Sequence, residues 1–330
     1  MTLQNSVLAT LIYYDILDFP LTAPEVHRYL ISPARLTQDP AVGIFTLDKV
    51  AQGLESLVKD AVVSSRGGLY FLQGRGELFD LRSEREKIAA KKWNKFLKIS
   101  KWFQAVPYLR GILASGSLAL NNTDYDSDFD VLAVAKSGRL YTCRIFLSLV
   151  ASLFRARRTR YQSSAPDKFC FNHYITDGRL NIKYESLFNA QTYANLKPVL
   201  ASNELLGAFY DENLWLNEYI HDFHPSRGFV LNNSPSSFLW AVAKTGEFIL
   251  DSRLGGWVEN WAKKYQQKRI RENPATHESG GRVVFNDHEL EFHPRSFEAF
   301  AINKYNQNLK KFGIVPFVQE KDSGLTPSRG

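Results

Sequence analysis

Two aspartates at alternate positions open an apolar run, and a Gly-Ser pair precedes them by ten residues. The carboxylates are Asp128 and Asp130, the apolar run covers residues 131–135, and the pattern predicts a strand over residues 129–135. Side chains two residues apart on a strand project from the same face. Two adjacent anions repel each other unless a cation lies between them, and a divalent metal is the usual solution. The spacing therefore predicts that Asp128 and Asp130 bind Mg²⁺ or Mn²⁺.

The Gly-Ser pair, Gly116 and Ser117, ends a second apolar run over residues 111–115. Glycine allows the backbone to approach a phosphate closely, and a serine hydroxyl can donate a hydrogen bond to it. A phosphate cradle that faces a two-carboxylate metal site suits nucleotidyl or phosphoryl transfer. We therefore expect Gly116 and Ser117 to bind the phosphates of an NTP.

The two motifs together, Gly-Ser-Leu-Ala-Leu and Ser-Asp-Phe-Asp-Val-Leu, resemble the signature of the DNA polymerase β-type nucleotidyltransferase superfamily. This superfamily includes CCA-adding enzymes and poly(A) polymerases, and the resemblance covers roughly residues 106–200. It implies an α/β core with a mixed sheet and a metal-dependent transfer of an NMP from an NTP to a hydroxyl. In that reaction Asp128 and Asp130 hold the metal, while Gly116 and Ser117 hold the β- and γ-phosphates.

A calcium loop is one alternative for these aspartates, because Asp124 and Asp126 continue the alternation. An EF-hand loop that begins at Asp124 needs glycine at its sixth position and glutamate at its twelfth. The chain has Phe129 and Ala135 there, which excludes the calcium loop. A plain acidic turn before a buried strand remains as the alternative.

The superfamily usually places a third acidic residue on a later strand, which here is predicted over residues 168–175. Alternation gives that strand a polar face made of Lys168, Cys170, Asn172 and Tyr174. Asn172 is the residue best placed to face the metal and is our candidate for the third catalytic position. An amide can bind a metal but cannot act as a general base at neutral pH.

A carboxylate from the adjoining loop, Asp177 or Glu185, is the other way to complete the site. Two further residues are candidates for nucleotide binding: Arg144, at the start of the helix predicted over 139–155, and Lys168. For both, a role in capping or at the surface is the alternative. The histidine pairs, His221 with His224 and His288 with His293, lack ligand spacing and are expected to be structural.

Four regions follow from the pattern of apolar residues, which predicts an α+β or α/β multidomain protein. They are a winged-helix-like domain (1–76), a basic linker helix (77–105), the nucleotidyltransferase core (106–200) and a helical C-terminal domain with a small β-hairpin (201–330). The first domain is predicted to end in a β-hairpin over residues 62–72, and the last to contain a helix over 204–220 and a hairpin about residues 286–287. The opening run Tyr-Tyr-Asp-Ile-Leu-Asp-Phe-Pro-Leu-Thr resembles the winged-helix leader of uncharacterised bacterial nucleotidyltransferase-domain proteins. This domain either contacts nucleic acid or docks on protein, and its third helix carries little positive charge.

Basic residues gather in three clusters, at 82–101, 155–160 and 263–271. They favour RNA, such as tRNA, as the acceptor of the transferred nucleotide, and a protein hydroxyl or a small molecule is the alternative acceptor. For the linker helix we expect the aromatic residues to pack on the core and the lysines to be solvated, and contact with an RNA backbone is the alternative. The rival function is a nucleic-acid-binding or regulatory protein that senses nucleotide with a degenerate core.

The composition is that of a well-packed globular chain, with 330 residues, 44% hydrophobic and 13% aromatic. The formal charge of +7 favours an anionic partner. Two cysteines without ligand spacing and no secretory leader predict a cytoplasmic protein. The longest apolar stretch, 145–154, is too short to cross a bilayer, so we expect no membrane partner.

Overall fold

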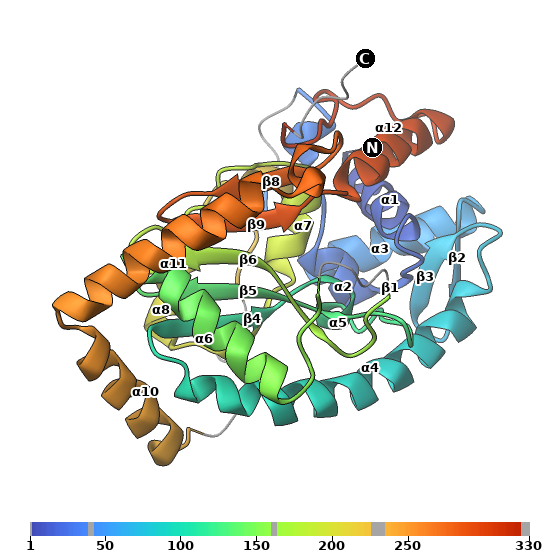
Figure 1. The fold of residues 1–330 in the computed structure, drawn as a ribbon. Helices are drawn as coiled ribbons and strands as arrows, with labels where there is room; N and C mark the ends of the chain where they lie inside the picture. The colour runs from blue at the N-terminus through green and yellow to red at the C-terminus, as the bar shows by residue number, and fades with distance from the viewer. Residues whose placement is uncertain (1, 39–42, 160–163, 226–234, 325–330) are drawn as a thin grey trace.

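The computed structural model describes residues 2–38, 43–159, 164–225 and 235–324. Within them the chain is a mixed α/β protein with twelve α-helices and two open sheets, of three and six strands (Figure 1). No helix in these four segments is long and apolar enough to span a bilayer.

The N-terminal unit combines three helices with the smaller sheet. Its elements in chain order are α1 (Thr2–Asp15), β1 (Leu21–Thr22), α2 (Ala23–Arg28), α3 (Leu47–Lys59), β2 (Val63–Arg66) and β3 (Leu69–Leu72). Helix α2 begins with a capping box. The Thr22 hydroxyl accepts a hydrogen bond from the backbone N–H of Glu25, and the Glu25 carboxylate accepts one from the backbone N–H of Thr22. The predicted hairpin is confirmed, with Gly67 and Gly68 at positive φ in its turn.

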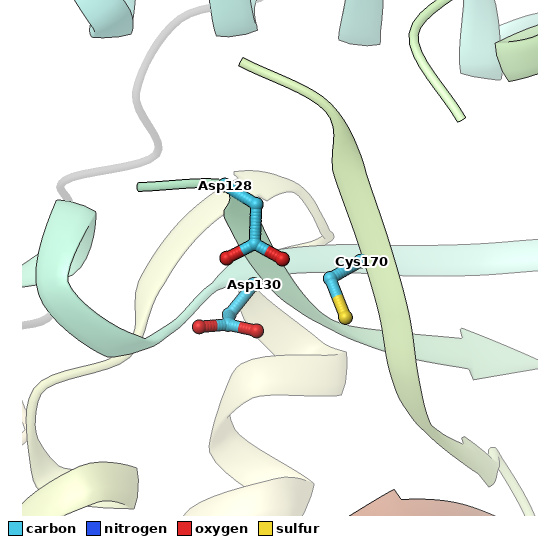
Figure 2. Close-up of side chains that lie close together, drawn as sticks. All are labelled: Asp128, Asp130 and Cys170. Atoms are coloured by element: carbon cyan, nitrogen blue, oxygen red, sulfur yellow. The ribbon is translucent and has the colours of Figure 1, made fainter. Parts of the chain in front are cut away.

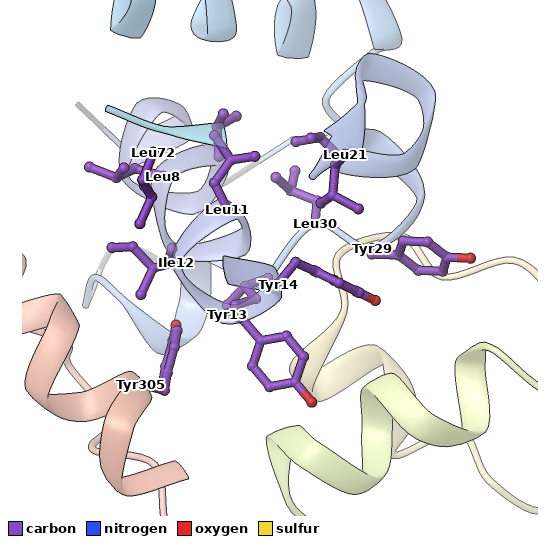
Figure 3. Close-up of a cluster of buried hydrophobic side chains, with 14 of the residues drawn as sticks. Leu8, Leu11, Ile12, Tyr13, Tyr14, Leu21, Tyr29, Leu30, Leu72 and Tyr305 are labelled. Atoms are coloured by element: carbon purple, nitrogen blue, oxygen red, sulfur yellow. The ribbon is translucent and has the colours of Figure 1, made fainter. Parts of the chain in front are cut away.

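The apolar core of this unit continues into the rest of the chain. Residues of α7 (Leu187–Ala194) and α12 (Glu298–Lys311) belong to the same buried cluster as α1 and α3 (Figure 3). The Tyr14 hydroxyl donates to Gln191 Oε1 on α7 at 2.8 Å, across this contact. The N-terminal unit is therefore packed firmly against other parts of the molecule.

The six-stranded sheet carries the predicted motifs. Its spatial order is β7 (Lys197–Leu200), β4 (Leu109–Ala114), β5 (Phe129–Ala135), β6 (Phe169–Thr176), β9 (Glu289–His293) and β8 (Arg282–Phe285). The β5–β6 pair is parallel and the other pairs are antiparallel. The late hairpin predicted near residue 286 is confirmed, and its strand β9 pairs with β6, so the C-terminal region completes the sheet that carries the two aspartates.

Helices cover both faces of this sheet. On one face Phe129, Val131 and Ala133 pack under α4 (Leu78–Ser100), α6 (Leu140–Leu153) and α11 (Arg253–Arg271). On the other face Leu132 and Val134 pack under α7, α8 (Asn203–Asp211) and α9 (Leu216–Tyr219). The remaining helices are α5 (Gly116–Ala119) and α10 (Ser237–Leu250).

One predicted helix is wrong in its extent. The segment 204–220 was expected to be continuous, but it is divided between α8 and α9. The Asn213 side chain lies at the break, where its Oδ1 accepts from the backbone of Ile182 and from Trp215 Nε1. Asn213 thus bonds to the chain that follows β6, and this tertiary contact ends the helix.

Candidate functional site

The turn after β4 brings the Gly-Ser pair directly onto Asp130. Gly116 has a φ of +64°, and a Cβ atom built on it would lie 2.6 Å from Asp130 Oδ2. Only glycine combines this backbone conformation with so close an approach. The Ser115 backbone donates to the carbonyl of Asp130 at 2.9 Å, which fixes the turn to β5. The structure therefore brings Gly116 and Asp130 together, as the sequence predicts.

The two aspartates converge with one cysteine. Asp128 lies just before β5, Asp130 lies on it, and Cys170 is the direct partner of Asp130 on the parallel strand β6. One oxygen of each carboxylate and the Cys170 sulfur all lie within 4.8 Å of one another (Figure 2). The predicted pair of carboxylates is therefore present, with a thiol as its third neighbour.

Two further side chains bind these carboxylates. Arg158 Nη1 donates to Asp128 Oδ2 at 2.5 Å and lies 3.8 Å from the Cys170 sulfur. Asn172 Nδ2 donates to Asp130 Oδ1 at 2.9 Å, so the predicted neighbour of the site is in place. The sequence did not identify Arg158 as a site residue, because nothing local distinguishes it from the other arginines of the 155–160 cluster.

The electrostatics of the pair are unbalanced. Burial, followed by the charge of Asp128, raises the pKa of Asp130 to about 7, although Arg158 and Asn172 act in the opposite direction. Burial and both aspartates likewise raise the pKa of the Cys170 thiol above its usual value. Near neutral pH the site therefore holds less negative charge than two free carboxylates, and a divalent cation would favour the fully ionised pair.

The strict alternation predicted for β6 is wrong. The pairing with β5 shifts by one residue between Asp130 and Leu132, which marks a β-bulge. As a result Tyr174 does not share a face with Asn172, and it packs instead with Phe129 in the core on the opposite side of the sheet.

Neither Arg144 nor Lys168, the two further candidates for nucleotide binding, places its side chain in a contact with this site. Arg144 lies on α6, across the sheet from Asp130, where its Nη1 donates to Gln266 at 2.7 Å and its guanidinium covers the Phe292 ring. The prediction that Arg144 binds the nucleotide at this site is therefore wrong. Lys168 is half-buried and contacts the site region through its main chain, because its carbonyl accepts from the Phe129 backbone at 2.8 Å.

A third carboxylate is absent from this group within the described segments. The Asp177 backbone donates to the carbonyl of Ala135, five residues along β5 from Asp130, which corresponds to roughly 16 Å. Its Oδ1 accepts from the Ser137 backbone there. Burial and the charge of Glu218 raise the pKa of Glu185. Glu185 therefore lies near α9, which carries Glu218. Neither residue completes the site.

The linker helix α4 supports the loop that leads to Asp128. Lys92 is buried, and its Nζ donates to the carbonyls of Tyr125 and Ser127 at 3.1 and 2.7 Å. It also pairs with Asp167 at 2.9 Å, as does Lys95. The expectation that the lysines of this helix are all solvated is wrong for Lys92.

A groove of about 310 Å³ lies against this loop. Its lining residues are Ile88, Lys91, Lys92, Lys95, Tyr125 and Asp167. Because Lys92 and Lys95 already bind Asp167, Lys91 is the exposed ammonium that this groove offers to an anion.

A second group of possible ligands, His173, Glu289 and Glu291, is buried on β6 and β9. Its cation is already supplied by the chain, because Arg282 binds both oxygens of Glu291 at 2.7 Å. In the described segments no group of this kind contains the histidines at 221, 224, 288 and 293.

No family model matches this chain, and comparisons with curated proteins and with solved structures also found no match.

Proposed function

We propose that this protein is a metal-dependent nucleotidyltransferase that moves an NMP from an NTP to a hydroxyl acceptor. The observation that carries the proposal is the contact between the Gly116 turn and Asp130, at the point where Asp128 also converges. A turn open to a phosphate and a pair of carboxylates open to a cation are the two parts that this chemistry needs.

The donor set fits a hard divalent cation. Carboxylate oxygens suit Mg²⁺ and Mn²⁺, whereas softer metals prefer a thiolate. Cys170 is neutral near pH 7 because its pKa is raised, so Asp128 and Asp130 define the site. A metal held there would position the α-phosphate and neutralise the charge that develops on the leaving group.

The protein's own groups have separate roles around that centre. Gly116 and the half-exposed Ser117 would hold the β- and γ-phosphates. Arg158 is a cation already within reach, and its guanidinium can bind a phosphate once a metal takes its place beside Asp128. Asn172 orients Asp130 through its amide N–H, so we assign it a positioning role.

We propose RNA as the acceptor, although fewer basic residues are free to bind it than the sequence suggested. Some of the positive charge on α4 is used internally, since Arg82 binds Glu25 and Lys92 binds Asp167. Lys87, Lys91 and Lys98 stay exposed on that helix and are the candidates for contacts with an RNA backbone.

The N-terminal unit has the element order of a winged helix, α1-β1-α2-α3-β2-β3. Its shared core with α7 and α12 favours docking on protein over DNA reading. The exposed side of α3 mixes Lys49 and Lys59 with Asp48 and Glu55, so it offers no basic surface to a duplex.

A nucleotide sensor without transferase activity is the second candidate. It is favoured by Asn172 at the position where a catalytic carboxylate was expected. The two functions share the NTP·metal site and differ only in whether the α-phosphate is transferred.

The test is calorimetric titration of ATP with Mg²⁺ or Mn²⁺ into the wild type and the Asp128→Asn, Asp130→Asn double variant. We expect the double variant to lose metal-dependent binding, because it removes both anionic ligands. Asp126→Asn is the matched control, since Asp126 is exposed in the same loop.

Equal binding by the wild type and the double variant would refute the site. Labelled NTPs with total RNA then separate the two functions. Transfer of label supports the nucleotidyltransferase, and binding without transfer supports the sensor.

A further inference from the structure

Two helices outside the proposed active site expose an unusual amount of apolar surface where they join. Helix α10 ends at Leu250 and α11 begins at Arg253, and Figure 1 shows them meeting at the edge of the molecule. Four large side chains beside this junction are exposed, by 84%, 61%, 69% and 66% respectively: Phe248, Ile249, Leu254 and Trp257. We call these four residues the α10–α11 corner.

The exposed surface continues along α11 at helical spacing. Leu254, Trp257, Trp261 and Tyr265 lie three or four residues apart and so occupy one face. The opposite face, with the buried residues Glu259, Ala262 and Gln266, packs toward α6. The rings of Trp261 and Tyr265 stack on each other with centroids 5.7 Å apart.

Helix α10 is apolar on nearly all sides. Only Leu239, Ala243 and Glu247 are buried on it, while Phe238 and Trp240 are exposed. A helix that is apolar all round is normally covered. The α10–α11 corner, Trp261 and Tyr265 continue this exposed surface on α11. Exposed apolar side chains that gather on one face, rather than lying singly, mark a surface that meets a partner, so we infer that a partner covers this one.

The charge around this surface is positive. Arg253, Lys264 and Arg269 are exposed on α11 beside the aromatic face, as is Lys268, whose Nζ lies 3.7 Å from Glu272 at the end of the helix. The acidic residues on the two helices and between them already have partners within the chain. Glu247 pairs with Arg110 and Lys244. Glu259 accepts from the backbone of residues 141 and 142, and Asp251 pairs with Lys136 and Arg139. A two-fold contact with a second copy would bring like charges together, which is unfavourable.

We propose that the α10–α11 corner binds the surface of an anionic lipid bilayer. Exposed Trp, Phe and Leu beside Lys and Arg are the composition of helices that lie in the membrane interface. The apolar side chains would enter the headgroup region, and the four basic residues would meet lipid phosphates. Such attachment needs no spanning helix, and it departs from our expectation from the sequence that the protein has no membrane partner.

The corner has a fixed geometry that suits this role. A Cβ atom on Gly255 would lie 1.5 Å from the carbonyl oxygen of Leu250, so only glycine permits the two helices to meet here. The Gly255 backbone donates to Ser252 at 3.0 Å within the same turn. The main chain at the junction is thus fixed, and it sets the angle at which the two helices present their apolar side chains.

The experiment is flotation of the 330-residue chain with vesicles of phosphatidylcholine alone or with phosphatidylglycerol added. We expect binding to the anionic vesicles, weakened by salt, and a blue shift of tryptophan fluorescence. The Phe248→Ser, Trp257→Ser variant should bind at least about tenfold more weakly. Val315→Ser, Phe317→Ser is the matched control, because Val315 and Phe317 are exposed outside the two helices.

Circular dichroism verifies that both variants are folded. Failure of the wild type to bind anionic vesicles overturns the proposal, as does an equal loss in the control variant. A concentration-dependent dimer that only the Phe248→Ser, Trp257→Ser variant abolishes, without vesicle binding, identifies a second copy as the partner instead. Vesicle binding does not depend on nucleotide, so this test is independent of the proposed enzymatic activity.

Discussion

Two groups of carboxylates flank strand β6, and an arginine reaches each of them in a different way. At the Asp128–Asp130 group, Arg158 forms its ion pair with one of the two carboxylates, Asp128, and its side chain is 35% exposed. At the Glu291–Glu298 group, Arg282 is 7% exposed and binds both oxygens of Glu291 and one of Glu298. The first group is open to solvent on one side, and the second is enclosed.

The enclosed group has a hydrogen-bond partner for each carboxylate oxygen of Glu291 and Glu298. Ser186 and the Ser323 backbone donate to one oxygen of Glu298, and the Ser323 hydroxyl donates to the other. Although burial acts to raise it, His173 and Arg282 hold the pKa of Glu291 below its usual value. The pKa of Asp130 is raised instead. The completeness of the donor set therefore separates a structural group of charges from a group that still attracts a cation.

The largest expected effect comes from removing the enclosed arginine. Arg282→Met should lower the free energy of unfolding by about 3–5 kcal/mol, because it leaves buried carboxylates without their cation. Arg158→Met should change it by at most about 1 kcal/mol, because that arginine is partly exposed. Urea unfolding of both variants at neutral pH measures the difference. Equal losses would mean that the two groups are built alike.

The second expected effect is a difference in pH dependence between the two groups. The folded-state pKa of Asp130 is about 7, above its unfolded value, so the folded protein retains a proton that the unfolded chain releases. The contribution of Asp130 to stability is therefore full below about pH 4 and is lost as the pH rises toward 7, by up to about 1.4 kcal/mol per pH unit. For Glu291, whose pKa is lowered, the contribution is present above its unfolded pKa and is lost as the pH falls.

Comparison of the wild type with Asp130→Asn isolates the first contribution. The stability difference between the two proteins without metal should change steadily between pH 4 and 7, in favour of the variant at the higher pH. A difference that is constant over this range would contradict the raised pKa of Asp130.

The sequence predicted what is local and missed what depends on the pairing of distant segments. Strand β5 has the predicted start and end, and the Gly116 turn lies where the spacing put it. The contact of Arg158 with Asp128 depends on the main chain of residues 156–158, which binds Phe169 at the start of β6. No periodicity encodes that pairing, nor the bulge that moves Tyr174 to the other face.

The same reasoning explains the error at Lys92. Its spacing on an amphipathic helix is that of any solvated lysine, and only the tertiary fold brings carbonyls of the 125–127 loop to its ammonium. The joining of β9 to β6 is equally non-local, because more than a hundred residues separate the two strands.

The smallest expected effect tests whether the open group accepts one more ligand. Asn172→Asp replaces the amide that donates to Asp130 with a third carboxylate. In the absence of metal it should lower the free energy of unfolding by about 1 kcal/mol, because a hydrogen bond is replaced by repulsion. The affinity for Mn²⁺ should rise severalfold, because a carboxylate binds this metal more strongly than an amide does. Urea unfolding and calorimetric titration with Mn²⁺ measure the two quantities.

Asn172→Ala separates the contributions of the lost hydrogen bond and the added charge. It removes the N–H donor to Asp130 without adding a ligand, so it should cost similar stability and leave the Mn²⁺ affinity unchanged or lower. If the aspartate variant binds Mn²⁺ no better than the alanine variant, position 172 does not face the cation. Asn172 would then serve only to hold Asp130 in place, and the open group would be limited to the two ligands that the sequence predicted.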